Sequence, residues 1–245
     1  MASYQTAAVV LGSKNWGEAD KMVTLFTLER GLVEAAAFGC RRPRSPLAAG
    51  MQMFSSIEVQ LAEGRRVDTV RQCSLKRHYK KLSEDLEVMA YGSFVAEFLR
   101  EFLPPGQVEP QMFARLLYIL EAFESRNPRV TALMAVVQLL EFTGMQLHFE
   151  RCVRCGQEIS GAAGFSLSEG GAVCPDCSRR QNPQAQISAE LRAFILALRD
   201  YDWEKAPALK VTGALLMQTE KLLLTYLQNL LGKPLKSLAF IQSLT

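Results

Sequence analysis

The chain has 245 residues, of which 49% are hydrophobic and 22% charged. This composition is typical of soluble globular proteins and fits one large domain or two to three small ones. Six cysteines in a chain of this size do not suggest a disulfide scaffold, and no apolar run reaches the roughly 18 residues of a membrane-spanning helix. The start of the chain also lacks the basic segment of a signal peptide, so we expect no membrane association.

The net charge of +3 hides an asymmetry along the chain. Residues 1–80 contain 12 Lys and Arg against 7 Asp and Glu, whereas residues 81–150 contain 5 against 10. A basic segment followed by an acidic one suggests that an anionic ligand binds at the basic end. The alternative is that both segments are merely solvated surface.

The first 80 residues have the pattern of β-strands. Short runs rich in Val, Thr, Phe and Ile are separated by Gly- or Pro-containing breaks. These runs cover residues 4–12, 21–29, 32–39, 51–63 and 66–75. Five short strands are too few for an immunoglobulin-type sandwich, and they favour a small OB-type barrel, whose closure removes the exposed edges.

After Lys81 the apolar residues recur with a helical period. Ser83 and Ser188 are expected to cap two of the helices, and Gly232 to end the last one. The predicted helices cover 83–103, 110–125, 128–144, 188–201 and 212–231. Because helices lie on both sides of the cysteine-rich segment, we expect one helical domain with a cysteine module inserted. The predicted domains are therefore 1–81, 82–150, 151–180 and 181–245.

The cysteine module has the spacing of a metal site. Cys152 and Cys155 are separated by 18 residues from a second pair, Cys174 and Cys177. Two such pairs can present four sulfurs at the corners of a tetrahedron, so we expect a zinc ion. A four-thiolate shell is full, which predicts a structural rather than a catalytic role. The alternative, a catalytic metal using His148, lacks the open coordination position it needs.

Other chemistry is sparse in the sequence. Cys40 and Cys73 sit in or beside predicted strands and are expected to be buried apolar residues or free thiols. No phosphate-binding glycine loop, nucleophile elbow or metalloprotease motif is present, and the chain has two histidines. We therefore expect a protein that is not an enzyme.

The basic residues are more informative. Three arginines lie in one loop, "CRRPRSP", which contains two prolines. If the barrel is an OB-fold, the loops after strands 1 and 4 flank its nucleic-acid face, so their residues should converge. Cations that follow a phosphate backbone, with an aromatic side chain for stacking, bind single strands without sequence preference. The candidate DNA-binding residues are Lys14, Trp16, Arg41, Arg42, Arg44, Arg65, Arg66, Arg71, Lys76 and Arg77.

One long stretch of the sequence resembles a known family. "GEADKMVTLFTLERGLVEAAAFGCRRPRSPLAAGMQMFSSIEVQL" (17–61) resembles the N-terminal domain of the RecO family of bacterial recombination mediators. The matching features are the Gly-Glu-x-Asp start, the Arg-Arg-Pro-x-Ser loop and the Phe that follows it. The four-Cys module and the ending "LGKPLKSLAFIQSL" are also similar to that family.

The resemblance implies an α+β multidomain chain. Its parts would be an N-terminal five-stranded OB-fold β-barrel and an α-helical domain with an inserted four-Cys zinc ribbon. It implies binding of single- and double-stranded DNA, annealing of complementary strands, association with RecR, contact with the C-terminal tail of single-stranded DNA-binding protein, and loading of RecA. It also implies a cytoplasmic, nucleoid-associated protein. Two other readings remain open: a zinc-ribbon transcription or translation factor, and a zinc-dependent nucleic-acid hydrolase.

Overall fold

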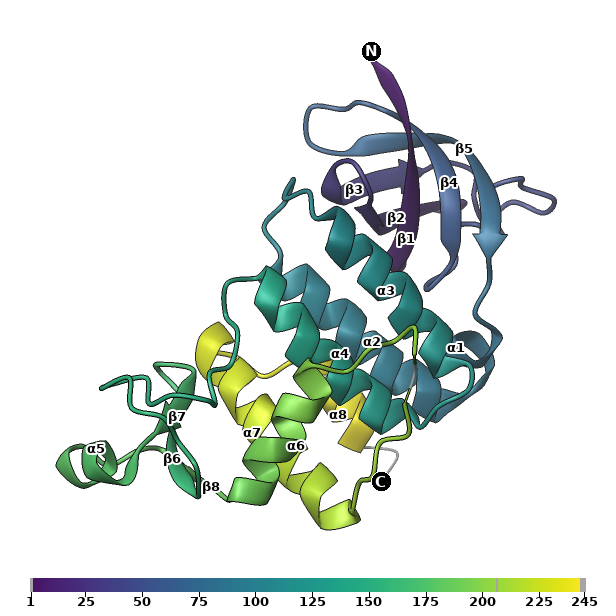
Figure 1. Cartoon of the computed structure of the whole chain (residues 1–245). Coiled ribbons are helices and arrows are strands. Elements are labelled where there is room, and N and C mark those ends of the chain that lie inside the picture. The colour runs from purple at the N-terminus through teal and green to yellow at the C-terminus, as the bar shows by residue number, and fades with distance from the viewer. Residues whose placement is uncertain (1, 206, 243–245) are drawn as a thin grey trace. The chain divides into compact units, whose positions relative to one another are not determined.

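Two compact units make up the computed structural model, which describes residues 2–205 and 207–242 (Figure 1). The first unit contains residues up to Pro128 together with a short segment from Ala239 onward, and the second contains Arg129–Leu238. The last three residues of the expected 181–245 domain lie outside the described part. The division into four domains therefore remains a prediction.

Five strands close into a barrel in the order β1-β2-β3-β5-β4, which confirms the expected OB-like barrel. All neighbouring pairs are antiparallel except β3 and β5, which pair in parallel through Ala35 with Asp68 and Ala36 with Thr69. The strands are β1 (Ser3–Trp16), β2 (Asp20–Thr27), β3 (Gly31–Ala37), β4 (Ser56–Ala62) and β5 (Asp68–Arg77).

The barrel forms because alternate side chains of these strands are apolar and point inward. Val23 and Leu25 of β2, for example, are fully buried in its core. The expected strand at 51–63 begins five residues later than predicted, at Ser56. Its apolar start instead forms turns, in which Phe54 has a positive φ of 66°. Met51 and Phe54 are buried there, so they look like strand residues in the sequence without being in a strand.

Three helices belong to the first unit: α1 (Lys80–Glu84), α2 (Leu86–Phe102) and α3 (Pro110–Phe123). The expected cap at Ser83 is wrong, because the helix breaks between α1 and α2. Asp85 caps α2 instead, with its carboxylate accepting from the backbone N–H groups of Glu87 at 3.0 Å and Val88 at 3.2 Å. α3 packs on the barrel, where Phe113 lies 5.9 Å from Phe26 between ring centroids.

The second unit is helical, with α4 (Pro128–Phe142), α6 (Ala189–Arg199) and α7 (Gly213–Leu231); α8 (Lys236–Gln242) follows. Ser188 caps α6 and Gly232 ends α7 with a φ of 65°, and both caps confirm the prediction. The fully buried Gln138 joins α4 to α6 and to the segment that follows α6. Its amide donates to the carbonyls of Leu198 and Tyr201, and its oxygen accepts from the indole N–H of Trp203.

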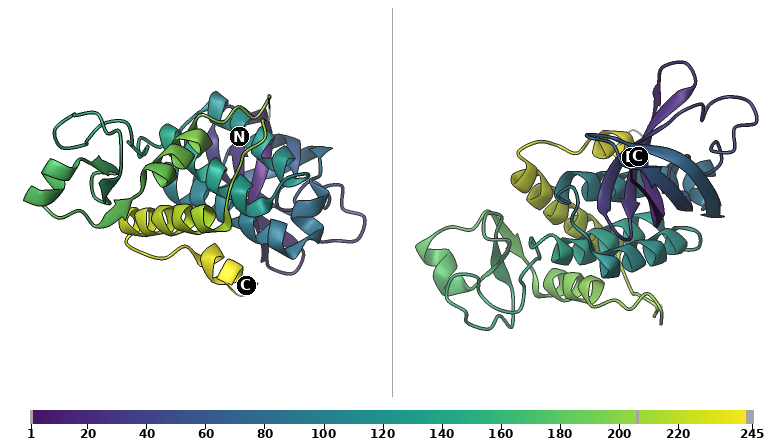
Figure 2. Two further views of the ribbon diagram at one scale, coloured as in Figure 1. Left: turned by 60° about the horizontal axis from the view of Figure 1, so that its bottom comes forward. Right: turned by 90° about the horizontal axis from the view of Figure 1, so that it is seen from above.

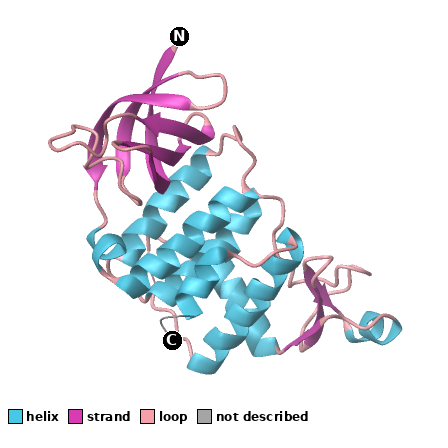
Figure 3. Cartoon of the chain, turned by 180° about the vertical axis from the view of Figure 1, so that it is seen from behind, coloured by secondary structure: helices cyan, strands magenta, loops and turns pink. Residues whose placement is uncertain are grey.

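A small sheet is inserted between α4 and α6, and Figure 3 shows its strands as a group distinct from the barrel. It contains β6 (Ala163–Ser166), β7 (Gly171–Val173) and β8 (Ala185–Ile187), in the order β7-β6-β8, with α5 (Pro175–Arg180) beside it. The β6–β7 pair lies between the two cysteine pairs. Strand β8 and helix α5 were not predicted. In the part of the chain that the structure describes, no helix is long and apolar enough to cross a membrane.

Candidate metal centre and cationic barrel surface

The four predicted cysteines meet at one point in the second unit. The Sγ atoms of Cys152, Cys155, Cys174 and Cys177 all lie within 4.8 Å of one another, and those of Cys155 and Cys174 are 3.7 Å apart. A tetrahedral zinc ion with Zn–S bonds of about 2.3 Å requires sulfurs about 3.8 Å apart. The four thiols therefore fit a metal of this size and could bind one.

Local backbone geometry directs the sulfurs inward. Gly156 follows the first pair with a positive φ of 75°, which lets the chain turn back directly after Cys155. Cys174 caps α5, so the second pair starts at a helix N-terminus. Its N–H also donates to the Cys152 sulfur at 3.3 Å. Burial works to raise the pKa of the Cys152 thiol, but the N–H groups of Cys174, Arg154 and Cys155 outweigh it and lower that pKa to about 6.

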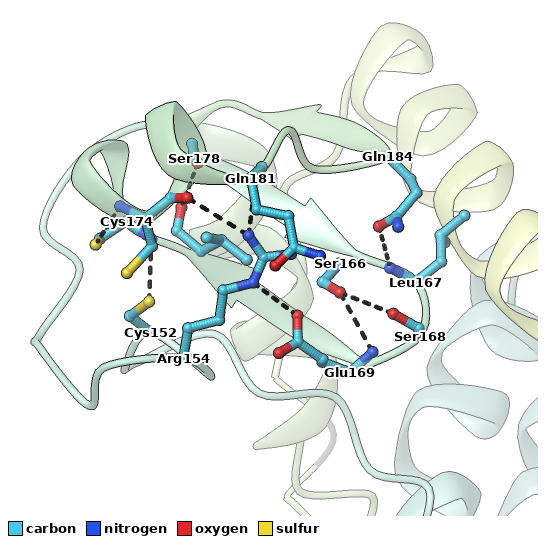
Figure 4. Close-up of polar contacts among 12 residues, drawn as sticks. Cys152, Arg154, Ser166, Leu167, Ser168, Glu169, Cys174, Ser178, Gln181 and Gln184 are labelled. Carbon is cyan, nitrogen blue, oxygen red and sulfur yellow. Dashed lines mark hydrogen bonds and ion pairs between the residues drawn. The ribbon is translucent and has the colours of Figure 1, made fainter.

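Arg154 ties the ribbon together beside the sulfurs (Figure 4). Its guanidinium donates to the Glu169 carboxylate at 2.9 Å and to the carbonyl of Gln181 at 2.7 Å. It thereby joins the first cysteine turn to the β6–β7 turn and to the end of α5. His148 lies outside the helices, since α4 stops at Phe142. Its side chain is exposed, and its backbone pairs with the β6–β7 hairpin.

The arginine loop, residues 38–46, is a series of tight turns on the barrel. Backbone hydrogen bonds join Arg42 to Gly39 and Ser45 to Arg42. Cys40 at one end and Leu47 just beyond the other are buried in the barrel core. Arg44 has a φ of 63°, an uncommon conformation for a residue other than Gly. The loop is therefore held in one shape before any ligand binds.

Three hydrogen bonds fasten the arginine loop to the β1–β2 hairpin. The Asp20 carboxylate accepts from the Gly39 N–H at 2.7 Å. Arg41 donates twice, from its backbone N–H to the carbonyl of Ala19 at 2.8 Å and from its guanidinium to the carbonyl of Gly17 at 3.3 Å. The hairpin and the loop project from the barrel next to each other (Figure 2). Together they form one surface, called here the hairpin–loop surface (residues 14–21 and 38–44).

Arg65 and Arg66 lie elsewhere on the first unit. With Arg30 of the β2–β3 turn and Arg100 of α2 they line a cavity of about 720 Å³. β3 and β5 run in parallel and pair through Ala36 and Thr69, so the β4–β5 loop lies at the end of this face away from the hairpin tip. The expected convergence of these arginines with Lys14 and Trp16 is therefore wrong: the two groups occupy opposite ends of the β2–β3 face.

The remaining predicted residues follow β5. Arg71 and Lys76 are exposed. Arg77 forms an ion pair with Glu121 of α3 at 2.6 Å, and its guanidinium lies 5.6 Å from the centre of the Tyr79 ring. These contacts give Arg77 a structural role within the first unit. Phe38 and Arg100 were missed. Phe38 follows directly after β3 in phase with the outward-facing Glu34, which is the signal that could have identified it.

The architecture defines an α+β protein built on an OB-like barrel, with a helical region that carries a four-cysteine ribbon. Two families match the chain, described as Recombination protein O N terminal over residues 1–79 and Recombination protein O C terminal over residues 83–239. The chain therefore belongs to the RecO family of DNA repair proteins.

Individual relatives match along more than nine tenths of their length. The DNA repair protein RecO of Symbiobacterium thermophilum is 32% identical over 249 residues, which cover 100% of this chain and 98% of that protein. The protein of the same name from Desulforamulus reducens is 28% identical over 245 residues, covering 100% and 96%. That from Moorella thermoacetica is 28% identical over 243 residues, covering 98% and 91%. The family resemblance seen in the sequence is thereby confirmed.

Proposed function

We propose that this chain is a non-enzymatic, DNA-binding recombination mediator that anneals complementary strands. The observation that carries the proposal is the hairpin–loop surface, where Lys14, Arg41, Arg42 and Arg44 are held on one preorganised loop pair. Within the described residues none of these four cations forms an ion pair with a carboxylate. They are therefore available for phosphates.

The mechanism that follows is electrostatic. Two complementary strands repel each other through their phosphates, and cations on one protein surface screen that repulsion while leaving base edges free. Arg65 and Arg66 supply a second cationic group at the far end of the same face. No step of annealing makes or breaks a covalent bond, so the chain's residues only bind and orient the strands.

In the second unit we assign the four cysteines to a structural zinc ion. Zinc favours four thiolates in tetrahedral geometry, and the sulfur spacing of 3.7 Å fits it. When bound, the ion would supply a cross-link between the two cysteine pairs. Arg154 and the Cys174 N–H then hold the ribbon around it. Since the thiols fill the shell, we assign no reaction to this centre.

The family membership supports the partners that we propose. The expected partners are RecR and the C-terminal tail of single-stranded DNA-binding protein. The expected DNA substrate is a single strand coated by that binding protein, onto which RecA is to be loaded. DNA would bind in both single- and double-stranded form, in the cytoplasm and at the nucleoid. The helical unit is the proposed docking site for the protein partners.

An annealing assay without ATP tests this function. Complementary strands, one of them fluorescently labelled, are coated with their binding protein and mixed with the full chain. We expect rapid duplex formation, and a large loss of rate when Arg41, Arg42 and Arg44 are changed to Glu. Cleavage of the strands that stops when a metal chelator is added would instead indicate a hydrolase. Binding to one sequence only, lost with the ribbon, would indicate a transcription or translation factor.

A further inference from the structure

Two aromatic side chains on the hairpin–loop surface are exposed and lie together. Trp16, at the end of β1, and Phe38, at the end of β3, have exposed fractions of 47% and 52%. Their ring centroids are 5.8 Å apart, and the ring planes are tilted by 48°. Neither ring contributes to the barrel core, so the fold does not explain why two large aromatic groups face solvent here.

The strand register places both rings on the same outer face of the barrel. Trp16 pairs with Asp20, and the neighbouring pair of Lys21 with Ala37 puts Phe38 on the other side of Asp20. The next residues on this face are Lys14 and Met22, which also pair with each other. An aromatic pair is thus followed along the face by a cation and a partly exposed thioether.

Hydrogen bonds between the residues next to Trp16 and Phe38 join the two segments that carry the rings. Asp20, which lies between the two rings, uses its carboxylate to fix the Gly39 N–H directly after Phe38. Arg41 binds the carbonyl of Gly17, the residue directly after Trp16. The hairpin tip and the start of the arginine loop therefore hold each other, which fixes the backbone that carries the two rings, and about half of each side chain stays exposed.

The charge around the rings selects the ligand. Segments 14–21 and 38–44 contain five Lys and Arg residues against two carboxylates, and one of these carboxylates, Asp20, is engaged with the backbone. An apolar protein surface would gain nothing from such a rim of cations. A nucleic-acid strand with unpaired bases matches it, because bases stack on aromatic faces while phosphates meet the cations.

We infer that Trp16 and Phe38 form a stacking platform for unpaired bases, which gives this surface a preference for single strands over duplex. The inference rests on the proposed DNA binding and adds its substrate class. In a duplex the base faces are covered by the neighbouring base pairs and offer the rings nothing to stack on, so duplex binds this surface through its cations. A single strand gains the arginines and the two rings.

The test compares the full chain with a Trp16→Ala/Phe38→Ala variant on three probes of equal length. These are an oligothymidine strand, an abasic sugar-phosphate strand and a duplex. The wild type should bind oligothymidine more tightly than the abasic strand. The variant should lose about 10- to 100-fold in affinity for oligothymidine and less than about 3-fold for the other two probes, since stacking is lost and charge is retained.

Two controls separate stacking from a structural effect. Met217→Ala removes a side chain of similar exposure, 59%, from the second unit and should change no affinity. Trp16→Phe keeps a ring, so it should keep binding, but it should lose the quenching of tryptophan fluorescence that oligothymidine causes in the wild type. Retention of that quenching would assign it to Trp203, in the second unit, and overturn the inference.

The outcomes distinguish the two levels of the proposal. If the wild type binds all three probes and the double variant binds oligothymidine unchanged, or weakens equally on all three, the stacking platform is wrong while DNA binding stands. If the wild type binds none of them, the proposed function itself fails.

Discussion

Neutralising the arginine loop should reduce the salt dependence of DNA binding by a calculable amount. The change is Arg41→Gln, Arg42→Gln and Arg44→Gln in one chain. Each phosphate contact on a single strand contributes about 0.7 to the slope of log K against log salt, and on duplex about 0.9. If each arginine contacts one phosphate, the slope should fall in magnitude by about 2 on a single strand and by about 3 on duplex.

This slope difference is large enough to measure by fluorescence anisotropy. Between 50 and 200 mM salt, the variant should lose about 20-fold less affinity for a single strand than the wild type loses, and about 40-fold less for duplex. The loop's turns are closed by backbone hydrogen bonds, so the fold should survive the substitutions. Arg41 also donates to the carbonyl of Gly17, and a glutamine side chain is too short to replace that contact fully.

A matched variant controls for net charge. Arg151→Gln, Arg179→Gln and Arg180→Gln remove the same three charges from the ribbon, where Arg151 faces Glu158 and Arg179 faces Asp176. We expect its slope to equal that of the wild type. An equal decrease in both triple variants would refute the reasoning, because net charge and not the arginine loop would then govern binding.

Three further changes test the rest of the structure. Cys174→Ser should release bound zinc, measured by mass spectrometry, and expose the ribbon to protease; full metal content in the variant would contradict the four-thiol site. Asp85→Ala removes two acceptor contacts at the start of α2 and should cost about 1 kcal/mol of unfolding free energy, whereas Asp85→Asn should cost less. Gln138→Leu leaves the buried carbonyls of Leu198 and Tyr201 without their donor and should destabilise the second unit by about 3 kcal/mol in denaturant unfolding.

The features of the fold that depend on local sequence were predictable. Ser188 and Gly232 cap their helices as expected, because capping depends on residue type and position alone. The start of β4 was not predictable, because Phe54 is apolar and buried but sits in a turn with positive φ. Burial selects for apolar side chains in turns and strands alike, so composition alone did not distinguish them.

The candidate sites divide in the same way. The spacing of the four cysteines was enough to predict that their sulfurs lie together. Each pair is local in the sequence, and the chain has to fold back only once to bring the two pairs into contact. The hairpin–loop surface required the register of three strands, which decides that Trp16 neighbours Phe38 and not Arg65. Register depends on long-range pairing, and a shift of one residue would have turned these side chains inward.

The proposed annealing function would use two cationic groups carried by one barrel. A strand that must later pair with another has to be held by its phosphates, loosely and at several points, so that its bases can turn toward a partner. The hairpin–loop surface and the arginines of the β4–β5 loop are attached to opposite ends of the same barrel strands, so the strands set their separation. A rigid sheet keeps that separation constant, whereas flexible loops alone would let the two groups collapse onto one strand. A variant with both cationic groups neutralised should therefore lose annealing more severely than it loses binding of either single strand, and equal losses would argue against two points of contact.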